Sequence, residues 1–590
     1  MITDSGSNRS AGVVYPEPLV APGRPVRPRW AAVVVAMVVV LAASIGVVLG
    51  AFLIGPRGGA AAAAAGYVPA NATIYYEMRL DLPGDQRAML EQFLGHFSGV
   101  DLDTVLGEGL DTALDKAFTT SASGYSYTKD LKPWLNGQVA VALIGYPSMS
   151  GGSDSASMPT ALLFIGARDA TAATDLLTRF RNDASSRGSE ATSEQYAGTT
   201  IWNWTTVGAT SFGQPLAISA TVTADQLIVG VGKDVLHTAL DVHAGKADSL
   251  ADRSEFRDGL ARLPVDRVLT YAIDAHAIAD AISKELASAS PGVAAALNSF
   301  TQSTASFGVG SARFEGSRIV ADAATTFDSG TQARGAPSGL TSHVPGDAMV
   351  YAASADVGPM LAKFADAVKS AIAATPNADQ LQQFEAALGT DLKSFVSWIG
   401  DVAFVASWDE NEPSMGLVIT PKDAHEASVR LLQLQGLLQL GSANGGPKAT
   451  ISEAQHGDAR ITTITFDTGS STGVPTWATT VQYTVTDDRV VIGLGQKFVA
   501  SVLDTTDASS LAGQQRFRDA ASAAGGSADE AAFWLDLAKV RDAIVSALPA
   551  DTAAQYHTLA ETWVKPFDYM IAVSHASGST LTNRSVIAVK

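Results

Sequence analysis

The chain has 590 residues, which is too long for a single hydrophobic core, and 46% of them are hydrophobic, so we expect folded domains rather than general disorder. It contains no cysteine, which excludes disulfides, thiolate metal sites and a cysteine nucleophile. The 59 acidic residues outnumber the 40 basic ones and give a net charge of −19. A body this acidic repels phosphate groups, which argues against nucleic acid and anionic membrane surfaces as partners.

The N-terminal part of the chain predicts a tail, a membrane span and a linker. Residues 1–30 contain spaced prolines and are expected to form a disordered tail. Residues 31–55 carry no charge and no proline, and as a helix these 25 residues reach about 37 Å, enough to cross the hydrocarbon core of a bilayer. Residues 56–66 are rich in glycine and alanine and are expected to be a linker.

The charges that flank the span predict its orientation. Arg24, Arg27 and Arg29 precede the span, and only Arg57 follows it closely. The positive-inside bias therefore places the N-terminus in the cytoplasm and the large C-terminal body outside the plasma membrane. A cleaved signal peptide is the alternative, but its apolar core is usually only about 7–15 residues long, which favours a retained anchor.

The body is predicted to be two tandem copies of one α+β unit, at residues 67–328 and 343–590, joined by a Gly/Ser/Pro-rich linker at residues 329–342. Thr221–Asp241 resembles Thr484–Asp504, and the segment that starts at Ser249 resembles the one that starts at Ser510, in the same order. Alternating, β-branched segments are separated by alanine-rich helical ones. This pattern favours mostly antiparallel sheets over a doubly wound parallel sheet.

No catalytic, cofactor-binding or metal-binding residue is predicted. The nine histidines show no metal-ligand spacing, and the serine hydrolase pattern GxSxG is missing from the sequence. The glycine pattern at Gly230–Asp234 lacks the spacing of a phosphate loop, and Gly493–Lys497 keeps both glycines but moves the lysine, so both are expected to be strand-to-helix turns. The carboxylates within Asp101–Asp111 are expected to be solvated.

A short motif recurs late in both predicted units. Phe256-Arg257-Asp258 returns as Phe517-Arg518-Asp519. An apolar anchor beside a charge pair most simply docks a helix onto the sheet, although a duplicated binding site would have the same pattern.

One helix differs between the predicted units. The second unit continues with leucines over Arg430–Leu440, where the first has the more polar Leu176–Ser186. A helix that is apolar on more than one face is expected to be buried, either within the chain or against a protein partner or an apolar ligand. The residues concerned are Leu431, Leu434, Leu437 and Leu438.

Two segments resemble a known family. The sequences YVPANATIYYEMRLDLPGDQRAML, from Tyr67, and YSYTKDLKPWLNGQVAVAL, from Tyr125, are similar to membrane-anchored proteins of the domain-of-unknown-function family DUF3352, of the type found in high-GC Gram-positive bacteria. The resemblance implies an anchor with an exported body, and it transfers no functional residue.

Three classes of function are therefore considered. The leading hypothesis is a non-enzymatic cell-envelope protein that binds or scaffolds, because no reactive constellation accompanies a large ordered body. The alternative is a carrier that holds a lipid or other apolar molecule between the two repeats. An envelope hydrolase is the third class, and it requires a polar cleft with a converging acid, base or nucleophile.

Overall fold

The computed structural model describes most of the chain after the expected linker. The described residues are 63–97, 111–112, 115, 125–145, 160–186, 191–205, 217–289, 294, 305–327, 332–337, 339–373, 378–409, 412–443, 448–467, 476–559 and 561–590. They belong to one unit, Gly50–Lys590. The expected tail at residues 1–30 and the expected span at residues 31–55 lie outside the described residues. Among the helices of the described residues, none has the length and apolar character required to cross a membrane.

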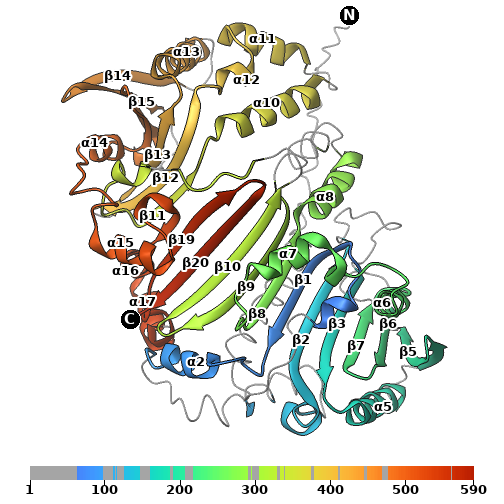
Figure 1. The fold of residues 1–590 in the computed structure, drawn as a ribbon. Coiled ribbons are helices and arrows are strands. Elements are labelled where there is room, and N and C mark those ends of the chain that lie inside the picture. Colours follow the sequence, from blue (N-terminus) through green and yellow to red (C-terminus); the bar gives the residue numbers. More distant parts are fainter. Residues whose placement is uncertain are drawn as a thin grey trace, which may run out of the picture. The chain divides into compact units, whose positions relative to one another are not determined.

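Within the described residues, twenty strands form the framework of the fold (Figure 1). Those before the expected second linker are β1 (Ala72–Arg79), β2 (Leu135–Ile144), β3 (Thr160–Ala167), β4 (Ala191–Tyr196), β5 (Thr199–Thr205), β6 (Ala217–Val222), β7 (Gln226–Val231), β8 (Leu269–Asp274), β9 (Ala305–Glu315) and β10 (Arg318–Phe327). Those after it are β11 (Val350–Ser354), β12 (Ile399–Asp409), β13 (Glu412–Pro421), β14 (Ala449–His456), β15 (Ala459–Phe466), β16 (Thr480–Val485), β17 (Val490–Leu494), β18 (Ala531–Leu535), β19 (Phe567–Ser577) and β20 (Thr580–Val589).

Helices and short helical turns connect the strands. The first group is η1 (Ala63–Gly66), α2 (Gln86–Leu94), η3 (Tyr127–Leu131), α5 (Ala170–Ser186), α6 (Val235–His243), η4 (Leu250–Asp252), α7 (Ser254–Ala261) and α8 (Ala275–Ala289). The second group is η5 (Leu340–Ser342), α10 (Gly358–Ala373), α11 (Ala378–Leu388), α12 (Leu392–Phe395), α13 (Ala424–Ala443), η6 (Thr476–Thr479), α14 (Phe498–Leu503), α15 (Gln515–Ala523), η7 (Ala528–Glu530), α16 (Leu537–Ala547), α17 (Ala550–Leu559) and α18 (Glu561–Val564).

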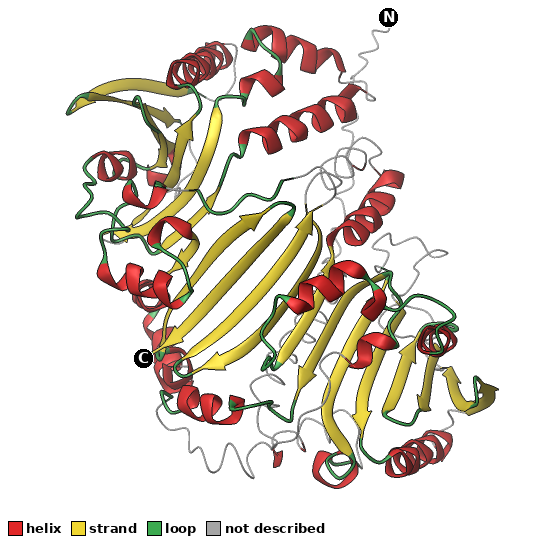
Figure 2. Ribbon diagram, in the orientation of Figure 1, coloured by secondary structure: helices red, strands yellow, loops and turns green. Residues whose placement is uncertain are grey.

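All the strands join one antiparallel sheet. Followed from pair to pair, the strand order is β4-β5-β6-β7-β3-β2-β1-β8-β9-β10-β20-β19-β18-β11-β12-β13-β17-β16-β15-β14. Figure 2 shows β9, β10, β20 and β19 side by side in the middle of this sheet. The chain is thus a mixed α+β protein with a large antiparallel sheet, as the sequence predicts.

Tight turns at glycine close the two central hairpins. Gly316 lies between β9 and β10 at φ 60°, and Gly578 lies between β19 and β20 at φ 60°. This left-handed conformation is readily available to glycine and rarely to other residues. The two hairpins therefore turn at matching positions.

Helices pack on both faces of the sheet. In the N-terminal half, one core contains Phe256 of α7, and the core on the other face contains Leu176 and Leu177 of α5. In the C-terminal half, Phe517 of α15 and Leu431 of α13 belong to two corresponding cores. Each half is therefore layered as helix, sheet and helix.

Both expected linkers contribute residues to these cores. Ala64 and Ala65, at the end of the segment 56–66, are buried in the first core of the N-terminal half. Leu340, within the segment 329–342, is buried in the core that contains Phe517. The folded structure thus begins before Tyr67, and the second linker ends in a packed turn.

The buried face of β1 is the polar one. Glu77 and Arg79 are buried, whereas Tyr76 and Met78 on the opposite face are only half-buried. The Tyr75 hydroxyl donates a hydrogen bond to Glu77, and Arg79 Nε donates one to Asp81 Oδ1 over 2.7 Å. This strand therefore buries charge that is compensated by neighbouring polar groups.

Candidate apolar binding pocket

An apolar pocket of about 400 Å³ lies between α16 and the strands β11, β12 and β13. Apart from Ser407, its lining side chains are apolar or aromatic, and they include two methionines that can adapt to a ligand's shape. The lining residues are Met349, Val350, Ala406, Ser407, Trp408, Pro413, Met415, Val540, Ala543, Ile544, Ala547 and Leu548. Trp408 and Ile544 are 40% and 56% exposed, which is unusual for side chains of their size and leaves apolar surface at this site.

Helix α16 forms one wall of the pocket, and its periodicity explains why. Val540, Ile544 and Leu548 follow one another at intervals of four residues, so they lie along one side of the helix. The helix begins after Asp536, whose Oδ1 accepts a hydrogen bond from the Lys539 backbone N–H over 3.0 Å. Asp536 therefore caps the helix that carries the wall.

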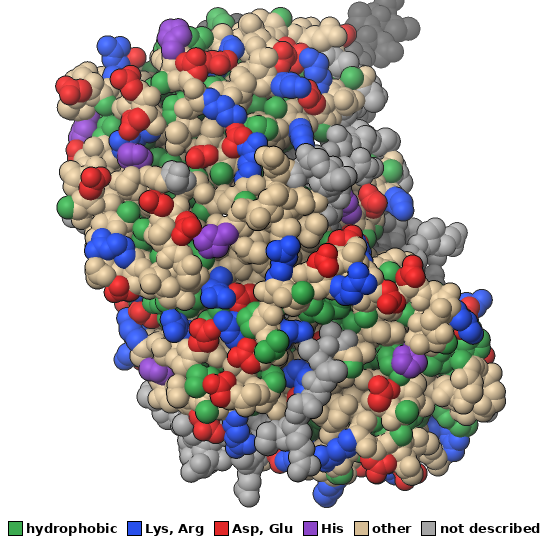
Figure 3. Space-filling view, viewed as in Figure 1, with side chains coloured by type: hydrophobic (Ala, Val, Ile, Leu, Met, Phe, Trp, Pro, Cys, Tyr) green, Lys and Arg blue, Asp and Glu red, His purple; other side chains and the backbone are tan. Residues whose placement is uncertain are grey.

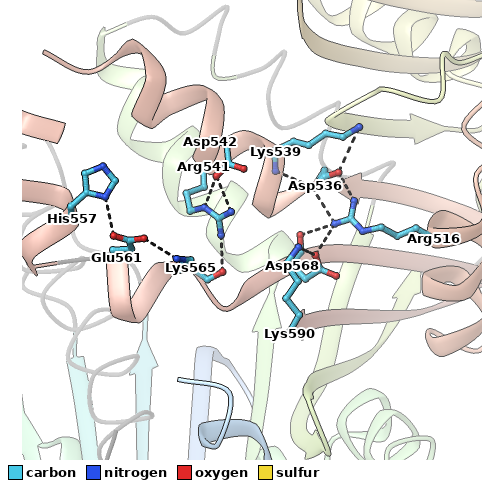
Figure 4. Close-up of polar contacts among 10 residues, drawn as sticks. All are labelled: Arg516, Asp536, Lys539, Arg541, Asp542, His557, Glu561, Lys565, Asp568 and Lys590. Atoms are coloured by element: carbon cyan, nitrogen blue, oxygen red, sulfur yellow. Dashed lines mark hydrogen bonds and ion pairs between the residues drawn. The ribbon is translucent and has the colours of Figure 1, made fainter. Parts of the chain in front are cut away.

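A cluster of charges fixes this end of α16 to the sheet (Figure 4). The side chain of Asp536 is only 1% exposed and pairs with Arg516 of α15, with Arg516 Nη2 3.2 Å from Asp536 Oδ1. Arg516 Nη2 also lies 3.0 Å from Asp568 Oδ1 on β19, and Lys590 Nζ lies 2.8 Å from the same oxygen. Helix α15, strand β19 and the C-terminal residue are thus joined to the start of the pocket wall.

Arg516 and Asp568 keep their charges at neutral pH. Burial alone acts to lower the pKa of the Arg516 guanidinium, but its hydrogen bond with Asp536 and the charges of Asp536 and Asp568 outweigh burial and raise that pKa. Burial likewise acts to raise the pKa of Asp568, yet Lys590 and Arg516 outweigh it and leave that pKa below its ordinary value. The wall of the pocket is therefore held by ionised groups.

The leucines that the sequence singled out on α13 lie elsewhere. Leu431 is buried in a core with Trp398 and Tyr483, and Leu434 and Leu438 pack partly buried against the same core. Leu437 is half-buried, and none of the four leucines lines the apolar pocket. Leu431 is therefore buried within the chain, which is one of the alternatives expected from the sequence. Leu432 and Leu440 on the same helix are 55% and 61% exposed.

The glycine patterns are turns. Gly232, between β7 and α6, has φ 117°, and Asp234 follows at φ 56°. In the C-terminal half, Gly495 takes φ 77° between β17 and α14. The interpretation of both segments as strand-to-helix turns is confirmed.

The aromatic anchors of the recurring motif dock their helices as expected. Phe256 contacts Tyr75 edge-to-face with ring centroids 5.9 Å apart, and Phe517 contacts Trp534 at 5.3 Å in the same geometry. Both phenylalanines are 1% exposed. The motif therefore supplies packing at both positions.

The acidic segment can be placed only in part. Asp101, Asp103 and Glu108 lie outside the described residues, and Asp111 forms an ion pair with Lys132. Within the part of the chain that the structure describes, no group of three or more histidine and carboxylate side chains could hold a metal ion.

Another pocket, of about 340 Å³, touches both halves of the chain and has a mixed polar and apolar lining. Arg262, Asp322, His575 and Arg584 are among its lining residues. The apolar pocket lies wholly within the C-terminal half. On the face shown in Figure 3, acidic and basic side chains are interspersed, so this face has no single-sign patch for an oppositely charged partner.

The pocket could be anticipated only in part. The apolar stripe of α16 is visible in the sequence as Val540, Ile544 and Leu548. The strands that complete the pocket, β11, β12 and β13, lie within residues 350–421, far from α16 along the chain. The pattern of the helix does not reveal which strands it faces, so the sequence does not predict the pocket.

Two comparisons, with curated proteins and with solved structures, do not assign a function. No curated protein matches the chain significantly. The solved structure of TP0453 in crystal form I is similar over 46% of this chain and 81% of that chain, with 9% identity and a TM-score of 0.22. Crystal form III of TP0453 matches over 46% and 80%, with 9% identity and a TM-score of 0.22. Similarity at this level carries no argument about fold or function.

The family comparison covers nearly the whole chain. The model described as "Protein of unknown function (DUF3352)" matches residues 32–589. The resemblance of the segments at Tyr67 and Tyr125 is thereby confirmed. The chain belongs to the DUF3352 family.

Proposed function

We propose that this protein is a non-enzymatic binding protein of the cell envelope, anchored in the plasma membrane by residues 31–55. The apolar span and the arginines on its N-terminal side support an N-terminus in the cytoplasm and a body outside it. An anchor of this kind keeps the body next to the membrane.

We propose further that the body consists of two tandem copies, residues 67–328 and 343–590. When β11–β20 are matched in order to β1–β10, both halves of the sheet have the same strand order from the outer edge inward. Isolated bridges also recur, between Pro69 and Ser249 and between Pro345 and Ser510. Such agreement in order and in detail supports duplication of a whole domain.

The ligand that we propose is an apolar molecule such as a lipid chain, and the apolar pocket carries this proposal. A cavity of about 150 Å³ lined by apolar side chains binds benzene, so about 400 Å³ corresponds to a ligand of about 16 carbon atoms. The nearly uniform apolar lining favours a hydrocarbon over a polar ligand. The carrier site that we propose is therefore within the second copy, whereas from the sequence it is expected between the copies.

Filling the pocket tests this function. We expect Ala543→Phe to reduce the amount of co-purifying apolar ligand at least tenfold, because a phenyl ring would occupy the space beside Ile544 and Leu548. Organic extraction of the purified protein followed by mass spectrometry measures the ligand. Ser546→Phe is the matched control, since Ser546 is an exposed residue of the same helix outside the pocket lining. Wild-type protein that is consistently free of ligand would contradict the proposal.

The orientation in the membrane has its own test. Protease added to intact spheroplasts is expected to digest the body, because we place residues after the span outside the membrane. An antibody against the tail should still detect a protected N-terminal fragment. A body that stays intact until the spheroplasts are lysed would reverse the proposed orientation.

A scaffold is the second candidate, and the outer side of α13 favours it. Leu432 and Leu440 are more than half exposed, and Phe384 of the neighbouring α11 is 44% exposed. Exposed apolar side chains of this size are typical of protein contact sites. The two candidates are separable, because the α13 surface and the apolar pocket share no residue.

A further inference from the structure

Among the described strands, β10 and β20 form the pair that joins the two halves of the chain. Phe97 of the first half also contacts Trp563 and Phe567 of the second. The strands are antiparallel, and the register runs from Arg318 opposite Ala588 to Thr326 opposite Thr580. Asp322 and Arg584 face each other in the middle of this register.

The residues at the centre of this junction occupy equivalent positions in the two halves. Gly578 follows Gly316 by 262 residues, and these glycines close the matching hairpins. Arg584 follows Asp322 by the same 262 residues, so each faces its own counterpart. Residues that precede Asp322 in β10 face residues that follow Arg584 in β20. The junction therefore has the self-complementary geometry of strand pairing across a two-fold axis in a homodimer.

The central pair breaks this symmetry by charge. Arg584 Nε lies 2.6 Å from Asp322 Oδ1, and the other carboxylate oxygen of Asp322 is held by Arg313. Two identical edges would place two aspartates, or two arginines, opposite each other at this point. Like charges directly opposite in a sheet are destabilising.

The other residue pairs of the β10–β20 register would accept a like half as readily as the unlike half of the chain. Val320 faces Val586, Ile319 faces Ile587, and the other rows contain mainly small or uncharged side chains. In the same register, β10 against a second β10 would oppose Val320 with Ala324 and Ile319 with Thr325, which are compatible neighbours. Only the central row would then be repulsive.

We infer that the β10 and β20 edges are a dimer-type pairing surface whose partner is chosen by charge. The Asp322–Arg584 pair selects the unlike half of the chain and rejects the like half of a second molecule. Pairing of like halves would leave open sheet edges that promote association between chains. This inference rests on the proposed duplication and is independent of the proposed ligand.

Complementary charge reversals test the inference in the full-length protein in detergent. Asp322→Arg alone puts two arginines at the centre, and Arg584→Asp alone puts two aspartates there. We expect each single variant to have a lower denaturant midpoint than wild type. Asp322→Arg combined with Arg584→Asp in one chain should have a higher midpoint than Asp322→Arg alone and remain monomeric, while the ion pair of Asp322 with Arg313 stays lost.

Mixing the two single variants gives the sharper result. When they are co-expressed, β10 of the Asp322→Arg chain can pair with β20 of the Arg584→Asp chain, which puts opposite charges at the centre of that junction. The reciprocal junction, between the two unaltered strands, keeps the native pair of Asp322 and Arg584. Pairing of like strands of the two chains would also put arginine opposite aspartate at each centre. By either route we expect a one-to-one dimer by light scattering. Wild type co-expressed with either variant is the control, because one of the two exchanged junctions would keep like charges, and this mixture should give no dimer.

Several outcomes would overturn the inference. These are a double reversal that is no more stable than the weaker single variant, single variants as stable as wild type, and co-expressed variants that form no dimer. If a single variant does not fold alone, co-expression and the double reversal still decide the matter. Wild-type ligand content does not enter this test, so its failure cannot be confused with failure of the proposed function.

Discussion

Replacing Asp536 with alanine is expected to lower the free energy of unfolding by about 3 kcal/mol. The side chain is 1% exposed, and it supplies the acceptor for both the Lys539 backbone N–H and the Arg516 guanidinium. Loss of a helix cap costs about 1 kcal/mol, and loss of a charged hydrogen bond costs about 1.5–3 kcal/mol. The expected total of about 3 kcal/mol is the sum of these two costs. We do not take the upper end of that sum, because Arg516 is 40% exposed and retains Asp568 as a partner.

Chemical denaturation measures this loss, and Asp542→Ala is its matched control. Asp542 lies on the same helix, but its side chain is 70% exposed and pairs with Arg541 at the surface. Its removal should change the free energy of unfolding by at most about 0.5 kcal/mol. Equal losses for the two variants would mean that the buried cluster does not hold α16.

A second carboxylate of the cluster, Asp568, makes the stability of this region depend on pH. The folded pKa of Asp568 lies below its ordinary value, so this group stabilises the fold above the unfolded pKa of about 3.9. Its contribution is lost as the pH falls through the lowered folded pKa. The stabilisation that Asp568 contributes should therefore be complete at neutral pH and be lost only in strong acid, which chemical denaturation of wild type and Asp568→Asn across this pH range measures. Because α16 is a wall of the apolar pocket, ligand content should fall together with stability.

Features determined by neighbouring residues could be predicted from the sequence. The aspartates at 274 and 536 precede apolar helical segments, and both side chains accept a hydrogen bond from a backbone N–H in the first turn of the helix. Phe256 and Phe517 are apolar residues within short polar segments, and both are buried anchors. Each of these roles depends on spacing of only a few residues, which the sequence displays directly.

Features determined by tertiary packing could not be predicted. The leucine-rich helix α13 is apolar on more than one side, but only the fold shows that Trp398 and Tyr483 cover Leu431. The apolar pocket combines α16 with strands more than 100 residues earlier in the chain. Helix periodicity identifies an apolar side without specifying what lies opposite it.

The orientation of β1 shows the same limit most clearly. In the sequence IYYEMR, charged residues alternate with apolar ones, and this alternation ordinarily places the charges toward solvent. The structure buries Glu77 and Arg79 instead. The charge of Glu77 is compensated in part by Arg267, which lies just before β8, the strand that pairs with β1. A sequence pattern cannot distinguish a solvated charged face from one that is compensated by a distant segment.

Glu77→Ala is accordingly expected to destabilise the N-terminal half by about 3–5 kcal/mol, the range for removing one partner of a buried charge pair. Glu77 is 2% exposed and accepts the hydrogen bond of the Tyr75 hydroxyl. Burial acts to lower the pKa of the Arg267 guanidinium and Glu77 opposes that effect, so loss of the carboxylate leaves a buried cation with less compensation. Chemical denaturation of the purified protein measures the loss.

Two further variants separate charge from packing at this site. Glu77→Gln keeps the size of the side chain and can still accept a hydrogen bond from Tyr75, so its loss should lie between those of wild type and Glu77→Ala. Glu91→Ala is the surface control, because Glu91 is 44% exposed and pairs with Arg87 one helical turn away, an interaction worth about 0.5 kcal/mol. If Glu77→Ala were no more costly than Glu91→Ala, the charges buried on β1 would not contribute to the stability of the sheet.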